Sequence, residues 1–542
     1  MKNIYLLDCT LRDGGYLNDW NFGKSHLLSI YERLIDARTD IIEVGFLDER
    51  RPFDINKSIM PDTQSAEKIW GAVKRRPPMV VGMIDYGTCS IDNIQPCEET
   101  FLDGIRVIFK KHLMNEAMEY CRQVKALGYK VFAQLVSITS YNREELLEVI
   151  SLVNDVKPYA VSIVDTYGLL HPADLMFYYN ILNEYVEESI QLGFHAHNNF
   201  QLAYANAIQF ISQDSKHDLV VDGTLYGMGK SAGNAPLELI AMRLNEQYNM
   251  NYNIESMLEA IEESILEFAK RVSWGYNLYF MLSGMNQCHP SYVGYLQEKE
   301  NLSLSKIDKI LSGMDKDEKK LLYNRLVADE IYENYMKTDG DDTESYEKLK
   351  NELQNKKILL IGPGKNIELQ RECVESYIKN EEPYVIAINY LPEGYKMDFI
   401  FITNPKRYQR LSERLYSVEN RAIKTIATSN VECMRGQFDY MVNRLPLLEK
   451  DERIKDNSFL MLLEIMKKIG ILEVVCAGFD GYSEQEDNYL YPEMEYQFVK
   501  QETTYLNKHI SEKVYELRKE MKINFLTYSQ YDKHGGIDNA GF

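Results

Sequence analysis

Two histidines separated by one residue, His195 and His197, stand in the segment GFHAHNN at the end of an apolar run. Residues i and i+2 of a β-strand point to the same face, so both imidazoles can enter one cavity. Imidazole nitrogens bind divalent transition metals, and a carboxylate and an amide oxygen would complete such a site. Two histidines hydrogen-bonded in a polar core would give the same pattern, so the metal interpretation needs partners elsewhere in the chain.

Candidate partners lie near the N-terminus, in the segment LLDCTLRDGGYLNDW at Leu6–Trp20. An apolar strand end runs there directly into Arg12, Asp13 and two glycines. Taken alone, Arg12 is explained by a structural ion pair, and Asp13 by a turn in which its carboxylate accepts backbone N–H groups. Together they place a guanidinium and a carboxylate at one turn, which favours a site.

Short apolar, β-branched runs alternate with amphipathic segments up to residue 223. Such alternation implies right-handed parallel crossovers in an α/β protein, and eight units favour a (β/α)8 TIM barrel over an open sheet. The expected strands are Ile4–Asp8, Ile41–Phe46, Met79–Ile84, Gly104–Phe109, Lys130–Leu135, Ala160–Asp165, Gln191–Ala196 and Leu219–Gly223.

Active sites of such barrels lie at the C-terminal ends of the strands. Each expected strand carries or is followed by a polar side chain suited to chemistry, and stability alone would not need so many on one face. We therefore expect the site at this face of the barrel. In strand order the candidates are Arg12 and Asp13; Glu43; Asp85; Arg106 and Lys110; Gln134; Asp165, Thr166 and His171; His195 and His197; Asp222 and Asn234.

The pattern divides the chain into a barrel at 1–300, a helical extension at 301–337, a linker at 338–350 and a second α/β domain at 351–542. The linker is predicted because TDGDDTESYEK is acidic and lacks apolar periodicity. Behind it, KKILLIGPGKN, YVIAINY, DFIFITN and ILEVVCAGFD predict strands of an open parallel sheet. The GPG turn lacks the third glycine of a dinucleotide fingerprint, so an ordinary strand–turn–helix connection explains it equally well.

The formal net charge of −21 argues against nucleic acid or an anionic membrane as the main partner. The sequence has no apolar run of the roughly 18 residues that a membrane span needs. Its eight cysteines are scattered and form no C-x-x-C pair, and the N-terminus enters a charged motif at once. We therefore expect a cytoplasmic protein, and also a homo-oligomer.

Five motifs resemble, in order and spacing, the superfamily of metal-dependent pyruvate aldolases, acyl-CoA lyases and isopropylmalate synthases. They are DCTLRDGG, IIEVGF, VDTYGLLHP, HAHNN and GKSAGNAPLE, and they cover about residues 1–300. GNAPLE is most similar to the 4-hydroxy-2-oxovalerate aldolases. The resemblance implies a divalent ion, Mn²⁺ or Mg²⁺, bound by Asp13, His195 and His197 with Asn234 in or near the coordination sphere. Imidazole ligands suit Mn²⁺ better than Mg²⁺.

The resemblance also implies the reaction and its substrates. A 2-oxo acid of the pyruvate type would bind the metal, Arg12 would stabilise the enolate at the keto oxygen, and an aldehyde would be the second partner. We assign substrate binding to the remaining polar groups at the strand ends, which are Glu43, Gln134, Asp165 and Thr166.

The acid or base of the reaction is where this sequence departs from the family. The oxovalerate aldolases have a histidine four residues after the arginine, and many lyases a glutamine, but here the residue is Tyr16. A neutral tyrosine, with a pKa near ~10, is a poor base. His171, and His289 with Tyr292 in the segment CHPSY, are the other candidates, and we favour His289 with Tyr292.

Two alternatives to an aldolase stay open. An acyl-CoA Claisen-type synthase or lyase is disfavoured because the segment GMGKSAGN lacks the cysteine loop of the lyases. A non-catalytic binding protein on an aldolase barrel is supported mainly by Tyr16. In the second half, the segment from Asp456 to Ser483 is similar to a bacterial sialyltransferase-like group, which implies a nucleotide-sugar partner and surface-polysaccharide biosynthesis.

Overall fold

The computed structural model describes residues 2–299, 302–314, 323–339, 341–449, 451, 454, 456–484, 488–490, 500 and 502–532. The chain forms two compact units, Met1–Ile331 (unit 1) and Tyr332–Phe542 (unit 2). The finer domain boundaries at 300, 337 and 350 stay predictions.

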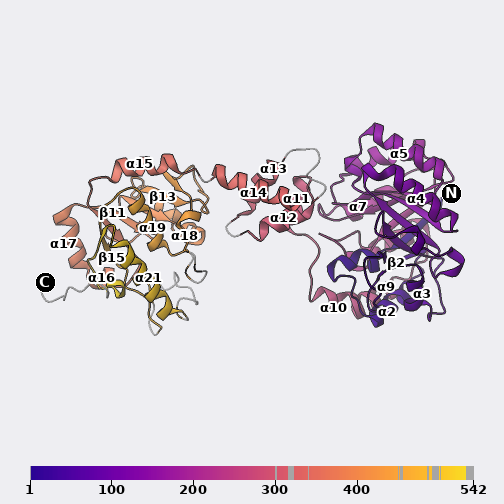
Figure 1. Cartoon of the computed structure of the whole chain (residues 1–542), viewed down its shortest axis with the longest axis horizontal. Coiled ribbons are helices and arrows are strands. Elements are labelled where there is room, and N and C mark those ends of the chain that lie inside the picture. The colour runs from indigo at the N-terminus through magenta and orange to yellow at the C-terminus, as the bar shows by residue number, and fades with distance from the viewer. Residues whose placement is uncertain are drawn as a thin grey trace. The chain divides into compact units, whose positions relative to one another are not determined.

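Within residues 2–299, eight parallel strands close a barrel, because β1 pairs with β9 on one side and with β2 on the other (Figure 1). The predicted barrel is thus confirmed. A two-residue strand, β3 (Ile59–Met60), is added beside β2 and was not predicted. The barrel strands are β1 (Ile4–Asp8), β2 (Ile41–Leu47), β4 (Met79–Asp85), β5 (Gly104–Phe109), β6 (Lys130–Leu135), β7 (Ala160–Asp165), β8 (Gln191–Ala196) and β9 (Leu219–Gly223).

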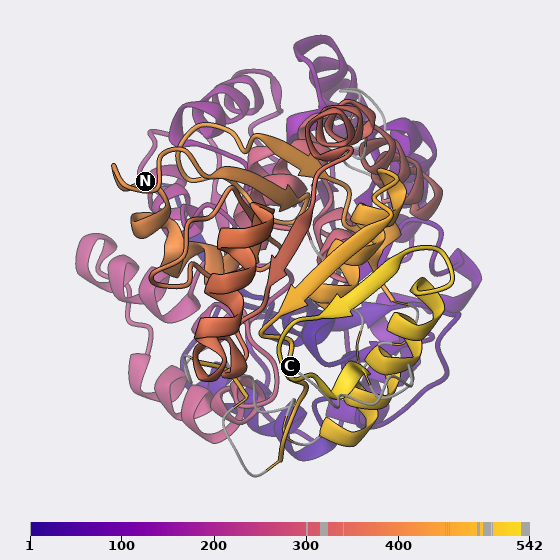
Figure 2. The same cartoon turned by 90° about the vertical axis from the view of Figure 1, so that its left-hand side faces the viewer.

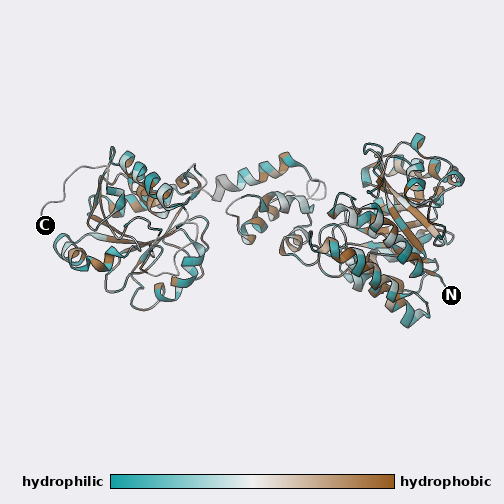
Figure 3. Ribbon diagram, turned by 90° about the horizontal axis from the view of Figure 1, so that it is seen from below, coloured by the Kyte–Doolittle hydropathy of each residue, from teal (hydrophilic) through white to brown (hydrophobic). Residues whose placement is uncertain are grey.

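The barrel strands are largely apolar, as Figure 3 shows by their brown colour. Leu6 packs in the layer between strands and helices, whereas its neighbour Leu7 joins a core that lines the inside of the barrel. This two-sided burial is why parallel strands are continuous apolar runs in the sequence. The helices that follow barrel strands are α2 (Lys24–Asp36), α3 (Gln64–Trp70), α4 (Met114–Ala126), α5 (Arg143–Val156), α6 (Pro172–Tyr185), α7 (Ala203–Ile211) and α8 (Leu237–Tyr248).

Further helices follow the barrel, as the sequence predicts. The first of them, α9, continues through a π-helical turn at Ile261–Ile265 into α10. They are α9 (Ile254–Ala260), α10 (Leu266–Ala269), α11 (Leu278–Met285), α12 (Pro290–Gln297), α13 (Leu304–Ser312) and α14 (Arg325–Asp339).

In the described part of unit 2, seven parallel strands form an open sheet in the order β14-β13-β12-β11-β10-β15-β16 (Figure 2). The strand order reverses between β10 and β15. The second α/β sheet is confirmed, with three strands (β13, β14 and β16) that were not predicted. The strands are β10 (Ile358–Ile361), β11 (Tyr384–Ile388), β12 (Phe399–Ile402), β13 (Lys424–Thr428), β14 (Tyr440–Val442), β15 (Glu473–Ala477) and β16 (Lys522–Phe525).

Helices cover both faces of this sheet, and the alternation along β10 shows it. Ile358 and Leu360 pack in one core with α15, α19 and α21, whereas Leu359 and Ile361 pack in the other with α17 and α18. The helices are α15 (Thr343–Leu353), α16 (Asn366–Leu369), α17 (Arg371–Glu381), α18 (Pro405–Leu415), α19 (Ser458–Lys468) and α21 (Thr503–Leu517).

The prediction of a linker without structure is wrong for part of its range. Residues Thr343–Leu353 form α15, and Tyr346, Leu349 and Leu353 are buried against the second sheet. Glu347 between these apolar positions is exposed, whereas Glu352 contacts Lys424 and Tyr440 of the sheet. The acidic composition therefore hid an apolar stripe at helical spacing.

Among the described residues, no helix combines the length and the apolar character that a bilayer crossing needs.

Candidate active site

Asp13, His195 and His197 meet at the mouth of the barrel. Asp13 ends the short helix Thr10–Asp13 (α1) after β1, while His195 lies in β8 and His197 directly follows it. Their Nε2 atoms lie 3.5 Å (His195) and 3.7 Å (His197) from Asp13 Oδ2. All three ligand atoms lie within 4.8 Å of one another, and all three residues are buried. This spacing suits a single divalent cation.

The charge states of these side chains also suit a cation. Burial raises the pKa of Asp13, but Arg12 and the two histidines outweigh burial and hold it well below its usual range, so the carboxylate is ionised. Burial lowers the pKa of His197 to about 4, so its imidazole is neutral and keeps a free lone pair at neutral pH. A carboxylate and a neutral imidazole are the forms that bind metals.

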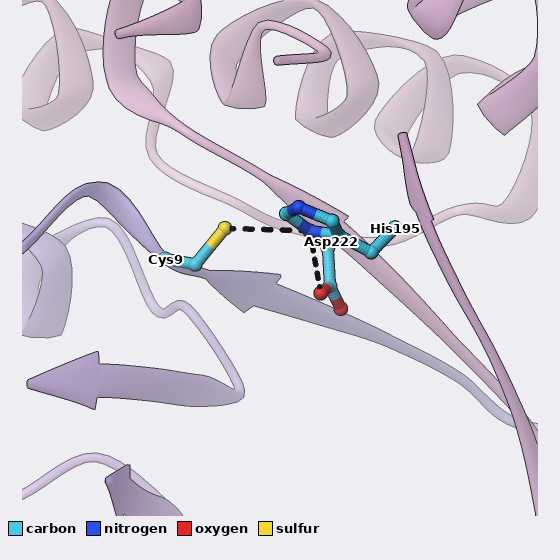
Figure 4. Close-up of side chains that lie close together, drawn as sticks. All are labelled: Cys9, His195 and Asp222. Carbon is cyan, nitrogen blue, oxygen red and sulfur yellow. Dashed lines mark hydrogen bonds and ion pairs between the residues drawn. The ribbon is translucent and has the colours of Figure 1, made fainter. Parts of the chain in front are cut away.

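His195 is oriented by a contact on its other nitrogen (Figure 4). Its Nδ1–H donates to Asp222 Oδ2 over 3.0 Å, and Cys9 Sγ lies 3.9 Å from the same nitrogen. Arg106 and His195 outweigh burial and lower the pKa of Asp222, so this carboxylate accepts. Nε2 is therefore left to face Asp13, as in the carboxylate–histidine–metal arrangement.

Cys9, His195 and Asp222 could form a second metal group by distance alone. Burial raises the pKa of the Cys9 thiol well above its usual range, so the thiolate that a metal needs is disfavoured. The thiol instead donates to Gly223 O over 3.4 Å. We interpret Cys9 and Asp222 as residues that position His195.

Backbone groups of Lys230 connect the other two candidate ligands. His197 Nδ1–H donates to the Lys230 carbonyl oxygen over 3.2 Å, and the Lys230 N–H donates to Asp13 Oδ1 over 3.0 Å. The sequence analysis did not assign a role to Lys230. Because the contacts are made by the backbone, no side-chain pattern could have indicated them.

Asn234 supplies an oxygen beside this group. Its side chain is buried, its Nδ2 donates weakly to Met228 O over 3.4 Å, and its Oδ1 has no hydrogen-bond partner among the described residues. A Cβ atom on Gly229 would come within 2.1 Å of Asn234 Nδ2 and 2.7 Å of Asp13 Oδ1, so Gly229 permits the close approach. A buried oxygen without a partner is costly, and a bound cation would satisfy it. The residues thus fit a metal ion.

Arg12 is held beside Asp13 with one end of its guanidinium available. It is buried, its Nε donates to Glu43 Oε2 over 2.8 Å, and its Nη1 contacts Asp13 Oδ2. Within the described residues, Nη2 has no hydrogen-bond partner. Trp20 Nε1 donates to the Arg12 carbonyl oxygen over 2.8 Å, a positioning contact that the sequence analysis missed although Trp20 lies eight residues away.

A network deeper in the barrel fixes the remaining charges. Arg106 donates to Glu43 Oε2 over 3.0 Å and to Gln134 Oε1 over 3.1 Å, and it also contacts Asp222 Oδ2. Glu43 and Gln134, predicted to bind substrate, are engaged in this network. Their contact with a substrate stays a prediction.

The other two residues predicted to bind substrate lie around the end of β7. Asp165 accepts backbone N–H groups from Leu169 (2.8 Å) and Leu170 (3.1 Å), and burial raises its pKa to about 6. Thr166 Oγ1 accepts the N–H of Ser137 over 2.7 Å. Both residues shape the loop after β7.

The predicted acid/base residues occupy different surroundings. Tyr16 is 41% exposed, and its hydroxyl has no hydrogen-bond partner among the described residues. Burial near Asp13 and Asp85 raises the pKa of its phenol despite Arg12. His171 is exposed at the start of α6, with its ring 5.5 Å from that of Phe200.

His289 and Tyr292 belong to α12. His289 Nδ1 accepts the Ser291 N–H over 3.1 Å, and burial lowers the pKa of its imidazole to about 4. Tyr292 is fully buried, and its hydroxyl accepts the Asn324 N–H over 3.1 Å. His289 therefore acts as the cap of α12, and Tyr292 lies in the core.

A second cavity lies in unit 2, beyond the carboxyl ends of β10 and β15 where the strand order reverses. It has a volume of about 80 Å³ and is lined by Gly364, Arg407, Phe459 and Asp480, among others. Asp480 Oδ2 accepts the Asn366 N–H over 2.8 Å. Open α/β sheets bind ligands at such reversal points.

Residues 3–263 match the HMGL-like family. The match covers the barrel and just under half of the chain. The family comprises aldolases, synthases and lyases and depends on divalent metals, in agreement with the superfamily that the sequence motifs indicate.

The relatives that match the barrel are named as different kinds of enzyme. The chain is 25% identical over 260 residues to 2-isopropylmalate synthase of Sulfolobus acidocaldarius, covering 47% of this chain and 66% of the relative. It is 26% identical over 273 residues to 4-hydroxy-2-oxovalerate aldolase 2 of Salinispora arenicola, covering 50% and 76%. The chain thus spans just under two thirds of that synthase. Among solved structures, HMG-CoA lyase of Bacillus subtilis aligns with a TM-score of 0.40 at 16% identity, covering 49% of this chain and 94% of the lyase.

Proposed function

We propose that the barrel is a divalent-metal-dependent aldolase that forms or cleaves a carbon–carbon bond on a 2-oxo acid of the pyruvate type. The observation that carries this proposal is the position of Arg12. It lies against Asp13, which also faces both histidines, and one of its guanidinium nitrogens has no hydrogen-bond partner in the part of the chain that the structure describes.

Asp13, His195 and His197 would hold the cation, with Asn234 Oδ1 as a further donor. Two imidazoles favour Mn²⁺ over Mg²⁺, which prefers oxygen ligands. A divalent cation bound there supplies Lewis-acid polarisation of a carbonyl oxygen.

Arg12 would orient the 2-oxo acid and stabilise the negative charge that grows on its keto oxygen. Its Nε and Nη1 are fixed by Glu43 and Asp13, so Nη2 is held in place before the substrate arrives. A preorganised donor of this kind is worth more in the transition state than in the ground state.

Aldol addition also needs a proton for the new alkoxide. Tyr16 supports this role better than His289, because its hydroxyl has no hydrogen-bond partner among the described residues and is protonated at neutral pH. His289, with a lowered pKa and a backbone N–H on Nδ1, could act only through Nε2. Tyr292 and His171 stay candidates.

The experiment is deuterium exchange into the methyl group of pyruvate, followed by mass spectrometry. Enolisation needs no aldehyde, so it tests the proposal before the second substrate is known. We expect exchange that depends on added Mn²⁺ or Mg²⁺ and stops with EDTA. Exchange no faster than with the EDTA-treated protein would contradict the proposal.

An acyl-CoA-dependent synthase is the second candidate, because a relative is named 2-isopropylmalate synthase. It predicts release of free CoA thiol from acetyl-CoA when a 2-oxo acid and metal are present. A thiol-reactive dye would detect that release, which the aldolase proposal does not expect.

We further propose that unit 2 binds a nucleotide sugar and that the two units serve surface-polysaccharide biosynthesis in the cytoplasm, as a homo-oligomer. The position of the cavity at the reversal of strand order supports the first part, although its volume of about 80 Å³ has room for only a small part of such a ligand. Its Arg407 offers a cation for a phosphate, and Asp480 offers an acceptor for sugar hydroxyls. Calorimetric titration with a CMP-linked sugar acid should show saturable binding that Arg407→Ala weakens, and light scattering would give the oligomeric state.

A further inference from the structure

A cavity of about 430 Å³ opens beside Arg12, between the segments that follow β1, β2 and β4. Phe46 connects the cavity with Arg12. It lines the cavity, and the Arg12 guanidinium lies 5.9 Å from the centre of its ring. The Tyr16 phenol lines the cavity as well, and its pKa responds to Arg12, Asp13 and Asp85. Phe46 is thus a side chain that contacts both the cavity and Arg12.

One wall of the cavity is aromatic. Tyr16, Trp20 and Phe46 pack edge to face, with ring centres between 4.8 and 5.9 Å apart. Gly15 permits this packing, because a Cβ atom there would come within 2.0 Å of the Trp20 indole. The rings are thus a built surface, suited to the C–H face of a ligand.

In contrast to the aromatic wall, Asp85 at the end of β4 gives the cavity a charged, polar group. Its carboxylate lines the cavity and makes no hydrogen bond or ion pair with any residue that the structure describes. Burial raises its pKa, which shows the cost of leaving it without a donor. A ligand hydroxyl would supply that donor. The hydroxyl of Tyr16 is a second polar group that could bond with a ligand hydroxyl.

The charges of the wall disfavour an anionic ligand. Arg50 forms a bidentate pair with Asp48, at 2.7 and 2.6 Å, and Arg51 contacts Asp19. The lining therefore has two carboxylates, Asp48 and Asp85, and no arginine that is free of a carboxylate. A phosphate beside Asp85 would be repelled by that carboxylate, whose charge Lys110 and Arg50 already compensate.

We propose that this cavity is the acceptor subsite and takes a neutral, hydroxylated aldehyde, an open-chain aldose. The proposal rests on the aldolase function. Pyruvate loses a methyl proton, its methyl carbon bonds to the aldehyde carbon, and the aldehyde oxygen becomes an alkoxide and takes a proton. The hydroxyls donate to Asp85 and the chain lies on the aromatic wall. The addition needs no oxidant or reductant.

The test compares aldehydes of equal chain length with the metal-loaded full chain. Product formation from pyruvate is measured with erythrose, butanal and erythrose 4-phosphate. We expect kcat/KM for erythrose to exceed that for butanal by about 10- to 100-fold, the worth of hydrogen bonds to a charged group. Erythrose 4-phosphate should react more slowly than erythrose.

Asp85→Leu should reduce the ratio of erythrose to butanal to within about threefold, because it removes the acceptor but keeps an apolar wall. Asp155→Asn is the matched control, since Asp155 pairs with Arg122 on the barrel surface. It should leave the ratio unchanged. Circular dichroism checks that both variants fold, and if Asp85→Leu does not, Asp85→Asn should lower the ratio in the same direction.

The outcomes separate the two proposals. Pyruvate exchange without a preference for erythrose, or with a preference for erythrose 4-phosphate, would overturn the acceptor proposal and leave the aldolase proposal intact. An unchanged ratio in both Asp85 variants would also overturn it. Absence of metal-dependent pyruvate exchange in the wild-type protein would overturn both.

Discussion

The carboxyl ends of the barrel strands carry charged side chains that contact one another across the barrel, whereas those of β10 and β15 in unit 2 carry two glycine turns packed against each other. In the barrel, contacts run from Arg12 through Glu43 and Arg106 to Asp222. In unit 2, a Cβ atom on Gly364 would come within 2.6 Å of the Gly478 carbonyl oxygen.

Closure of the sheet explains the difference. A closed barrel brings the ends of strands far apart in sequence to one point, so side chains of opposite charge can be buried together. An open sheet gathers only the neighbours of the reversal point, which suits binding. Among the described residues, both groups able to hold a metal lie in the barrel. This difference is consistent with the proposals of chemistry in unit 1 and ligand binding in unit 2.

The largest effect is expected from removing the imidazoles. The double variant His195→Ala/His197→Ala should abolish stoichiometric Mn²⁺ binding, because two of the candidate ligands are lost. Metal analysis after gel filtration measures it, with the exposed His112→Ala as control. Wild-type metal content in the double variant would contradict the assignment of the metal to these histidines of unit 1, since the ion would then lie elsewhere.

Arg12→Lys should slow pyruvate exchange about 10²–10³-fold, the usual cost of losing one preorganised donor. A lysine places a single ammonium and cannot contact Glu43, Asp13 and the keto oxygen at once. Arg33→Lys, on the surface beside Glu259, is the control. Equal rates in Arg12→Lys and wild type would remove Arg12 from the enolate role.

Tyr16→Phe and His289→Ala separate the proton donors. With an aldehyde present, loss of the donor should lower aldol turnover about 10²-fold, at the lower end for acid–base catalysis, while metal content stays unchanged. The free Tyr16 hydroxyl leads us to expect this loss in Tyr16→Phe. If only His289→Ala shows this loss of turnover, His289 is the proton donor, as the sequence analysis favours.

The smallest effect concerns acid stability. The pKa of His289 is about 4 in the folded chain and about 6.5 when unfolded, so the unfolded state binds more protons between these values. The contribution of His289 to stability is complete above pH 6.5 and is lost as the pH drops towards 4, by up to about 3 kcal/mol. His289→Gln should flatten this fall in unit 1 alone, as hydrogen exchange resolved by unit would show. A fall of equal size in the variant would exclude His289 as its source.

Much of the barrel could be predicted because its strands are buried on both faces. Six of the eight strands begin and end where the sequence predicts, and β2 and β4 each extend one residue further. β13, β14 and β16 were missed because they are short or carry polar residues, as KINF does in β16. Strand β3, with two residues, offers no periodicity at all.

The candidate metal ligands could also be predicted, because His195 and His197 share a strand face and Asp13 ends a distinctive turn. The contacts that orient them could not. Lys230 acts through its backbone, and Asp222 contacts His195 only because β8 and β9 are neighbours. The placement of Tyr292 in the core depends on how α12 packs, which spacing in the sequence does not reveal.

The most direct test of the account is a crystal structure of the protein soaked with Mn²⁺ and oxalate, with anomalous scattering to locate the ion. Oxalate resembles the enolate of pyruvate in shape and charge. The account predicts one Mn²⁺ bound by Asp13, His195 and His197, with Asn234 Oδ1 at or near it and Arg12 donating to oxalate. An ion on the Cys9 and Asp222 side of His195, or oxalate away from Arg12, would contradict it.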